Sequence, residues 1–214
     1  MAVDFKKTEK ELYHPKTTPT IVNVPEMTFI AVDGKGDPNT SEAYKTAMEI
    51  LYGLSYSIKM SKMSGSGPEG YFEYVVPPLE GLWWSPGGGM ADYLNKDNFF
   101  WTSIIRQPEF VTPEVFEEAK KALTRKKPGL DLSGARLIKI TEGLCVQVMH
   151  IGSYDDEPAT IAAMERHVAD NGYAADINDA RRHHEIYLSD PRKTAPEKLK
   201  TVIRLPIKKN EPGT

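Results

Sequence analysis

The sequence predicts an α+β fold built from two duplicated β-α-β-β units with pseudo-twofold symmetry. We expect an antiparallel sheet with helices on one side and a central ligand cleft. Three observations lead to this prediction. β-prone runs alternate with helical runs, and each half of the chain follows the order strand, turn, helix, strand, strand. The run YFEYVVPP (71–78) also resembles HHEIYLSDP (183–191), since both place a glutamate third and end near a proline. A ligand cleft is expected where duplicated units meet.

The first half contains one long β-prone run and one helical run. Residues 21–32 predict a strand, and residues 34–38 predict a turn. A helix is expected from a cap at residues 39–41 to about Tyr52, because apolar residues recur there at helical spacing. Three further strands are expected at residues 71–76, 82–84 and 99–105.

A helix at about 113–126 is expected to join the two halves. Thr112 followed by Pro113 is typical of a helix start, with a capping side chain and a proline in the first turn. In the second half a turn at 152–158 leads into a helix whose apolar face carries Ile161, Met164 and Val168. The strands of the second half are expected at residues 137–141, 144–151, 183–188 and 201–207.

The composition is typical of an ordinary globular protein. Of 214 residues, 40% are hydrophobic and 27% are charged. No apolar stretch is long enough for a membrane span, and the charged N-terminus lacks the apolar segment of a secretory signal. The single cysteine, Cys145, excludes an internal disulfide framework. These features predict a cytoplasmic protein without a membrane partner, and the net charge of −3 argues against nucleic acid as a partner.

The domain organisation follows from the same patterns. A monomer or weak homodimer is expected. The chain divides into a polar N-terminal lead-in at 1–20, a single domain at 21–208 and a flexible tail at 209–214. The domain consists of repeats at about 21–110 and 135–208, with the helix at 113–126 between them.

The three tryptophans lie close together in the sequence, between residues 83 and 101. A single aromatic residue is most simply explained by core packing. Three tryptophans around a glycine-rich connection instead favour a flat-ligand pocket, because an indole face suits a polycyclic ring. Trp84 and Trp101 are the predicted lining residues. Neighbours on a strand point to opposite faces, so the choice between Trp83 and Trp84 stays open.

Glu73 and Glu185 are the candidate acids. Each is expected on a strand, where residues two apart share a face. Glu185 would then project with His183 and Tyr187, and Glu73 would project with Tyr71. The alternative is an ordinary solvent-facing glutamate. In a partly apolar cleft, desolvation would raise the pKa of such a carboxyl toward that of a useful general base.

Several runs identify a family resemblance. The chain resembles GyrI-like small-molecule-binding domains, in their stand-alone subfamily, over about residues 20–208. The residues that carry this resemblance are HEIYLSDPRKT (184–194), PEKLKTVIRLPI (196–207), GLWW (81–84), FWTSIIRQP (100–108) and TPEVF (112–116). The resemblance implies a duplicated fold whose central cleft binds flat, often cationic drugs, with Glu185 at the position of a pocket glutamate. Some stand-alone members are cyclopropanoid cyclopropyl hydrolases, which open the strained ring of DNA-alkylating compounds of the yatakemycin and CC-1065 class in an aromatic cage.

That chemistry needs a held scaffold, an oriented water and a hydrogen-bond donor to the developing phenolate. Glu185 or Glu73 could orient the water, and Tyr71, Tyr154 or Tyr187 could donate the hydrogen bond. No cofactor is expected. No metal is expected either, because His183 and His184 point to opposite faces of a strand and no third ligand is apparent. The predicted catalytic residues are Glu185 and Tyr71, and the predicted ligand-binding residues are Glu73, Trp84, Trp101, Phe72, Tyr154, Tyr187 and His183.

Three functions remain open at this point. The first is a hydrolase of strained, flat xenobiotics, and we rank it first. The second is a non-catalytic protein that binds or sequesters small hydrophobic or aromatic ligands, which turnover would distinguish from the first. The third is a gyrase-inhibitor-like interaction module, which would expose a contiguous apolar patch rather than enclose a cavity.

Overall fold

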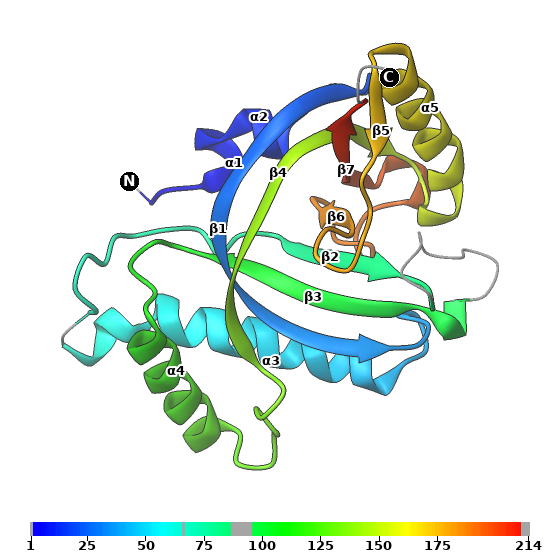
Figure 1. Cartoon of the computed structure of the whole chain (residues 1–214). Helices are drawn as coiled ribbons and strands as arrows, with labels where there is room; N and C mark the ends of the chain where they lie inside the picture. Colours follow the sequence, from blue (N-terminus) through cyan, green and yellow to red (C-terminus); the bar gives the residue numbers. More distant parts are fainter. Residues whose placement is uncertain (1, 66, 87–95, 211–214) are drawn as a thin grey trace.

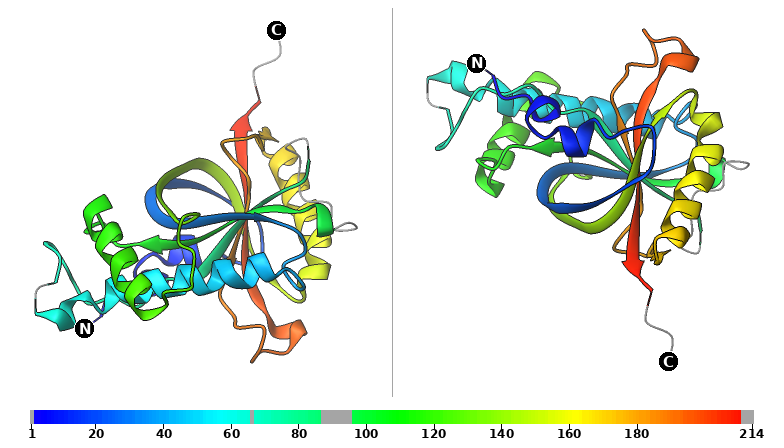
Figure 2. Two further views of the ribbon diagram at one scale, coloured as in Figure 1. Left: turned by 90° about the horizontal axis from the view of Figure 1, so that it is seen from below. Right: turned by 90° about the horizontal axis from the view of Figure 1, so that it is seen from above.

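In the computed structural model, six strands form a closed antiparallel ring. The structure describes residues 2–65, 67–86 and 96–210. The ring follows the order β1-β3-β2-β6-β7-β4 and closes where β4 pairs with β1, while β5 pairs with the end of β7. Figures 1 and 2 show the long, curved β1 and β4 side by side. The strands are β1 (Thr20–Lys35), β2 (Leu79–Trp84), β3 (Phe100–Gln107), β4 (Arg136–Ile151), β5 (Tyr173–Ala175), β6 (His183–Tyr187) and β7 (Lys200–Lys209).

Three longer helices pack on the outside of the ring. Alternate residues of β1 explain this arrangement: Ile30 and Val32 face the helices, whereas Phe29 and Ala31 face the interior of the ring. A first core cluster lies under α3 and α4, and a separate cluster lies under α5. The helices are α1 (Phe5–Thr8), α2 (Lys10–Tyr13), α3 (Glu42–Lys59), α4 (Pro113–Lys126) and α5 (Glu157–Asp170).

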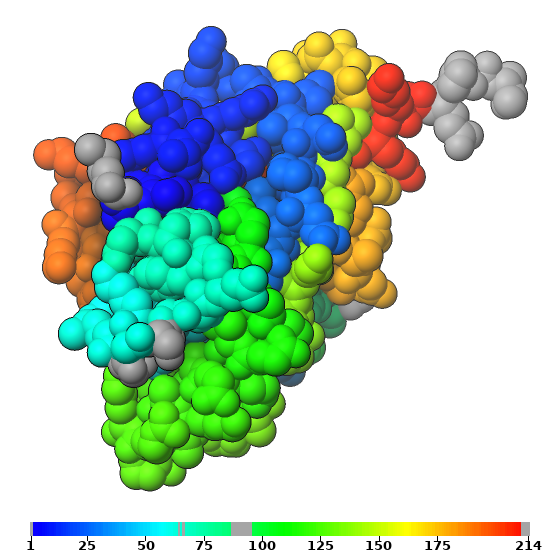
Figure 3. All heavy atoms as spheres, turned by 90° about the vertical axis from the view of Figure 1, so that its left-hand side faces the viewer, coloured from blue at the N-terminus to red at the C-terminus, as the bar shows by residue number. Residues whose placement is uncertain are grey.

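The segment expected as a polar lead-in, residues 1–20, contains the two short helices α1 and α2. Phe5, Leu12 and Tyr13 are buried in the cluster that fills the ring interior. Arg106 on β3 binds Glu9 at 2.6 Å, which ties the N-terminal segment to the ring. The N-terminal segment covers the upper part of the face seen in Figure 3. The helices therefore lie on both faces of the sheet, because the ring has an interior that α1 and α2 fill.

The strand expected at residues 71–76 was a wrong prediction. This segment forms one isolated bridge, between Val3 and Tyr74. Tyr74 is fully buried and its ring packs 5.9 Å from that of Phe110. The aromatic residues of the segment therefore serve packing rather than strand pairing. The two strands expected at 137–141 and 144–151 are one continuous strand, β4, in which Gly143 adopts a φ of 63°.

The duplication of the two halves stays a prediction. In the first half β1 pairs with β3 and β3 pairs with β2, and in the second half β4 pairs with β7 and β7 pairs with β6. This correspondence supports a repeat. The alignment of residues 71–78 with 183–191 does not, since only the second run is a strand. Of the expected tail at 209–214, Lys209 ends β7 and residues 211–214 lie outside the described residues.

The predicted helix start at Thr112 is confirmed, because its side chain accepts a hydrogen bond from the Val115 amide at 3.3 Å. Ser41 caps α3 in the same way through the Tyr44 amide, at 3.2 Å. None of the helices in the described part of the chain has the length and apolar character needed to cross a membrane.

Candidate functional site

A pocket of about 1150 Å³ lies between α3, the start of α5 and the segment that follows β6. Its deep end is lined by five aromatic side chains, which we call the aromatic cage: Tyr44, Trp83, Phe99, Tyr154 and Tyr187. Two pairs of rings in the cage meet edge to face, whereas Tyr44 and Trp83 are tilted by 32° at 6.1 Å. Trp83 and Phe99 have centroids 5.8 Å apart at 66°, and Tyr154 and Tyr187 have centroids 5.8 Å apart at 84°. These contacts hold the rings in fixed orientations around the space.

Glu185 lies at the deep end of the pocket and is 7% exposed. The Tyr187 hydroxyl donates a hydrogen bond to one carboxylate oxygen at 2.8 Å, and Nε2 of His183 lies 2.9 Å from the other. All three residues share one face of β6, as strand alternation requires. The carboxylate is therefore held by two neighbours of its own strand.

Trp83 completes this arrangement from β2. Its indole Nε1 donates to the Tyr187 hydroxyl at 2.9 Å. A Cβ at Gly81 would lie 2.5 Å from that nitrogen and 3.0 Å from the Tyr187 hydroxyl. The indole thus lies over Gly81, which has no side chain. Gly81 is paired with Glu185 in the register between β2 and β6. Only glycine leaves room for the indole there.

Glu157, the first residue of α5, joins His183 and Glu185 in a buried cluster. One potential ligand atom of each lies within 4.8 Å of the others, so these are the described residues that could hold a metal ion. No third ligand was apparent in the sequence because Glu157 falls in the expected turn at 152–158 and is distant in sequence from His183.

Two tyrosines of the cage remain protonated at neutral pH. Burial raises the pKa of Tyr154 to about 12, with the negative charge of Glu185 adding to the effect. Burial and Glu185 also raise the pKa of Tyr187 well above its ordinary value. Both hydroxyl groups therefore stay available as hydrogen-bond donors.

The opposite face of β6 carries a buried charge network inside the ring. The two ring nitrogens of His184 each lie 2.9 Å from a carboxylate oxygen, one of Glu80 and one of Glu142. Arg204 on β7 lies 2.6 Å from the other oxygen of Glu142 and donates to the Leu12 carbonyl at 3.0 Å. All four charged side chains are buried. The network thus joins β6 to β2, β4, β7 and the N-terminal segment behind the pocket.

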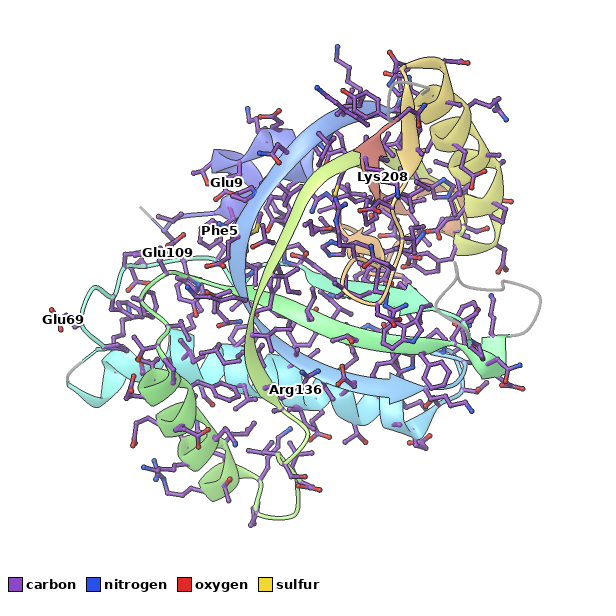
Figure 4. All side chains as sticks on the ribbon, in the orientation of Figure 1. Phe5, Glu9, Glu69, Glu109, Arg136 and Lys208 are labelled. Atoms are coloured by element: carbon purple, nitrogen blue, oxygen red, sulfur yellow. The ribbon has the colours of Figure 1, made fainter. Side chains whose placement is uncertain are left out.

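The three residues predicted from the 71–78 run do not reach the pocket, which corrects their assignment as site residues. The Tyr71 hydroxyl donates to the Lys59 carbonyl at 2.8 Å, Phe72 packs on Phe110, and Glu73 pairs with Lys62. Residues 71–73 follow closely after Glu69, which Figure 4 labels at the end of the molecule far from α5. The wrong assignment of Glu73 follows from the strand expected at 71–76, because that strand would have brought Glu73 to the cleft between the two duplicated units.

Two tryptophan assignments also change. Trp101 is fully buried in the core, where the Tyr44 ring packs edge-on at 5.0 Å. Trp84 points away from the cage, stacks on Phe100 at 5.9 Å and lies under the Arg182 guanidinium at 4.6 Å. Trp83 is therefore the tryptophan that faces the pocket. Trp101 contacts the cage through its packing on Tyr44.

The predicted residues that the structure brings together are Glu185, His183, Tyr154 and Tyr187. Sequence reasoning missed Tyr44, Phe99 and Glu157 as members of the site. In the sequence, Tyr44 is one apolar position of the expected helix that ends near Tyr52, and Glu157 is one residue of the expected turn at 152–158. Their convergence depends on how α3 and α5 pack around the closed ring, which no local pattern specifies.

Comparison with known proteins agrees with this architecture. An uncharacterized conserved protein from Listeria innocua is 50% identical, with a TM-score of 0.91, covering 96% of this chain and 100% of that chain. Two structures of a hydrolase from Listeria innocua are each 48% identical, with TM-scores of 0.88 and 0.90. They cover 96% and 97% of this chain and 100% of their own. No curated protein matches the chain significantly. The model of the GyrI-like small molecule binding domain matches residues 17–208, and the chain belongs to this family.

Proposed function

We propose that this protein binds flat aromatic xenobiotics in the aromatic cage and hydrolyses a strained cyclopropane by adding water. The observation that carries the proposal is the buried Glu185 carboxylate, held at the deep end of the cage by Tyr187 and His183. A carboxylate enclosed by aromatic faces can hold a water against a flat substrate. Relatives at 48% identity that are named hydrolases support an enzymatic role.

The proposed reaction adds one water across one carbon–carbon bond. The substrate is a cyclopropane fused to a conjugated dienone. Glu185 accepts a proton from water while the water oxygen bonds to the less substituted ring carbon. The broken bond delivers its electron pair through the conjugated system to the carbonyl oxygen, which becomes a phenolate. The proton taken up by Glu185 is then released and the phenolate is protonated through solvent, which restores the carboxylate and makes the product the substrate plus one water.

The cage tyrosines stabilise the charge that develops on the substrate oxygen. Tyr187 already donates to Glu185, so Tyr154 is the better placed hydroxyl to donate to the phenolate. With a pKa of about 12, the Tyr154 hydroxyl stays protonated at neutral pH and can donate this hydrogen bond. His183 fixes the orientation of Glu185 and acts as a positioning residue.

The test compares Glu185→Gln with the unchanged protein on a compound of the yatakemycin class. Mass spectrometry is expected to show gain of one water with the unchanged protein, and a loss of at least 100-fold in rate with the variant, as for removal of a general base. Binding of the ring-opened product, followed by tryptophan fluorescence, is expected to persist in both. Glu73→Gln is the matched control, because Glu73 is an exposed glutamate outside the pocket.

Equal hydrolysis by Glu185→Gln and the unchanged protein would contradict the proposed base. Tight binding with an unchanged ligand in every variant would instead favour the second candidate, a protein that sequesters flat compounds in the same cage. The family assignment as a small molecule binding domain supports that candidate to the extent of binding.

A further inference from the structure

A second cavity, of about 600 Å³, lies on the inner face of the sheet and shares no lining residue with the pocket that contains the cage. Its walls come from the end of β1, the end of β2, the start of β3 and the start of β4, and from the residues just before β6. Leu82, Ile138 and Ile140 form its apolar floor and pack against the cluster that fills the ring. Its volume lies within the range of roughly 300–1,000 Å³ that is usual for small-molecule sites.

This cavity lies at the end of the ring that the N-terminal helices leave open. Phe5 of α1 packs under Arg106, near the end of β3, whereas Phe100 lines the cavity at the start of the same strand. Phe100 and Arg106 are six residues apart, which is about 20 Å along a strand. Figure 4 likewise labels Arg136, another lining residue, well apart from Phe5. We call this cavity the ring-mouth cavity.

Two aromatic rings and two cations lie together in the ring-mouth cavity. Trp84 and Phe100 are paired in the register between β2 and β3, and their rings stack at 5.9 Å with an angle of 12°. The Arg182 guanidinium lies over the Trp84 ring at 4.6 Å, and Nζ of Lys35 lies over the Phe100 ring at 5.3 Å. Both rings are half-buried, so part of each remains accessible to a ligand. Flat apolar surface and positive charge are therefore combined at one place.

The charges that line the ring-mouth cavity leave an excess of positive charge. Three cations, Lys35, Arg136 and Arg182, lie there with two carboxylates, Asp33 and Asp179. Asp33 is paired with Arg136. Asp179 lies 2.6 Å from Arg182, but its side chain is 93% exposed, so this pair contributes little and a ligand carboxylate can replace it. Lys35 has no ion-pair partner among the described residues.

The two faces of β2 thus separate two sites of opposite charge. Trp83 faces the cage, where Glu157 and Glu185 lie together, whereas Leu82 and Trp84 face the ring-mouth cavity. Successive residues of a strand point to opposite faces, so one short strand supplies a tryptophan to each site. An anion is disfavoured beside the carboxylates of the cage and favoured beside the cations of the ring-mouth cavity.

We propose that the ring-mouth cavity is a second ligand site, which binds a flat aromatic carboxylate. The aromatic part packs against Trp84 and Phe100, and the carboxylate is held by Lys35 and Arg182. A guanidinium suits this role because its planar donors match the two oxygens of a carboxylate. The inference is independent of the hydrolysis proposed for the cage, since none of these residues lines that pocket.

The experiment measures binding of 2-naphthoate, a flat aromatic carboxylate, by calorimetry and by ligand-observed NMR. A single site with a Kd of about 0.1–1 mM is expected for a ligand of this size. The probe 2-naphthylmethylamine has the same rings and the opposite charge, and it is expected to bind to this site at least tenfold more weakly. The affinity for the naphthoate is also expected to fall as salt is raised, because the cations are partly exposed.

Four variants locate the binding. Trp84→Ala is expected to weaken naphthoate binding about tenfold, and Lys35→Gln about three- to fivefold. Lys139→Gln is the matched control for the lysine, because Lys139 lies between two lining residues of β4, points to the other face and pairs with Glu26. Trp83→Phe changes the cage alone and is expected to keep the parent Kd for the naphthoate.

Three results would overturn the proposal. The first is no binding of the naphthoate at concentrations up to about 5 mM, well above the expected Kd. The second is equal affinity for the naphthoate and the amine. The third is naphthoate binding that weakens in Trp83→Phe but not in Lys35→Gln, which would place the ligand in the cage. Lys35→Gln changes an exposed side chain, so it keeps the test decisive if Trp84→Ala does not fold.

Discussion

The buried charge network behind β6 predicts a specific dependence of stability on pH. Burial alone would lower the pKa of His184, but the carboxylates of Glu142 and Glu80 outweigh it and raise the pKa to about 9. Burial would raise the pKa of Glu142, but His184 and Arg204 outweigh it and lower the pKa to about 2. Protonated His184 is thus part of the native structure at neutral pH.

The sign and size of the effect follow from linkage. A histidine whose pKa rises on folding stabilises the fold fully below its unfolded pKa, near 6.5, and loses that contribution as pH rises through 9. A rise of 2.5 in pKa corresponds to about 3 kcal/mol, at about 1.4 kcal/mol per unit. For Glu142 the contribution is present above 4.5 and is lost as pH falls toward 2. Both shifts arise largely from one ion pair, so they are not added.

Urea unfolding followed by tryptophan fluorescence tests this reasoning at pH 6, 7, 8 and 9. The unchanged protein is expected to lose about 3 kcal/mol of unfolding free energy between pH 6 and pH 9. His184→Gln is expected to be less stable at pH 6 and to lose little further stability up to pH 9. His14→Gln, which changes an exposed histidine, is expected to follow the parent. The same slope in the parent and in His184→Gln would refute the assignment.

Two further predictions concern close packing at the site. Trp83→Phe removes the indole donor to the Tyr187 hydroxyl, so binding of a flat ligand is expected to weaken about five- to tenfold, as measured by calorimetry. An unchanged Kd would show that this hydrogen bond does not organise the cage. Gly34→Ala would place a Cβ 2.1 Å from two atoms of the buried Trp101 ring, and a loss of about 1–3 kcal/mol in unfolding free energy is expected. Gly134→Ala, where a Cβ meets no atom within 4 Å, is the control, and equal effects of the two substitutions would contradict the packing argument.

The parts of the fold that local patterns specify were predictable from the sequence. The caps at Ser41 and Thr112 and the apolar face of α5 each depend on neighbouring residues of one element. The strand prediction at 71–76 was wrong because β-branched and aromatic residues, which favour strands, also occur in buried loops. The closed ring was not predictable, since the pairing of β1 with β4 joins residues more than 100 positions apart.

In the candidate site, too, some residues were predictable from local sequence patterns and others were not. Strand alternation correctly groups His183, Glu185 and Tyr187, because the period of two needs no knowledge of the rest of the fold. Tyr44 and Glu157 come from α3 and α5, and their meeting point follows from tertiary packing alone. The choice of Trp83 over Trp84 depends on the register between β2 and β6, which sets Trp83 opposite His183.

The contacts on the two faces of β6 hold Glu185 in a fixed position. This strand of five residues pairs with β2 on one edge and β7 on the other, so it has no free edge. Its inner face is held by His184, between Glu80 and Glu142, and its outer face presents Glu185 to the cage. A carboxylate on such a strand needs little reorganisation when charge develops on a substrate, and this preorganisation is the main electrostatic contribution that enzymes make. Loosening the inner face should therefore lower kcat more than ligand affinity, because four of the five cage aromatics come from elements other than β6.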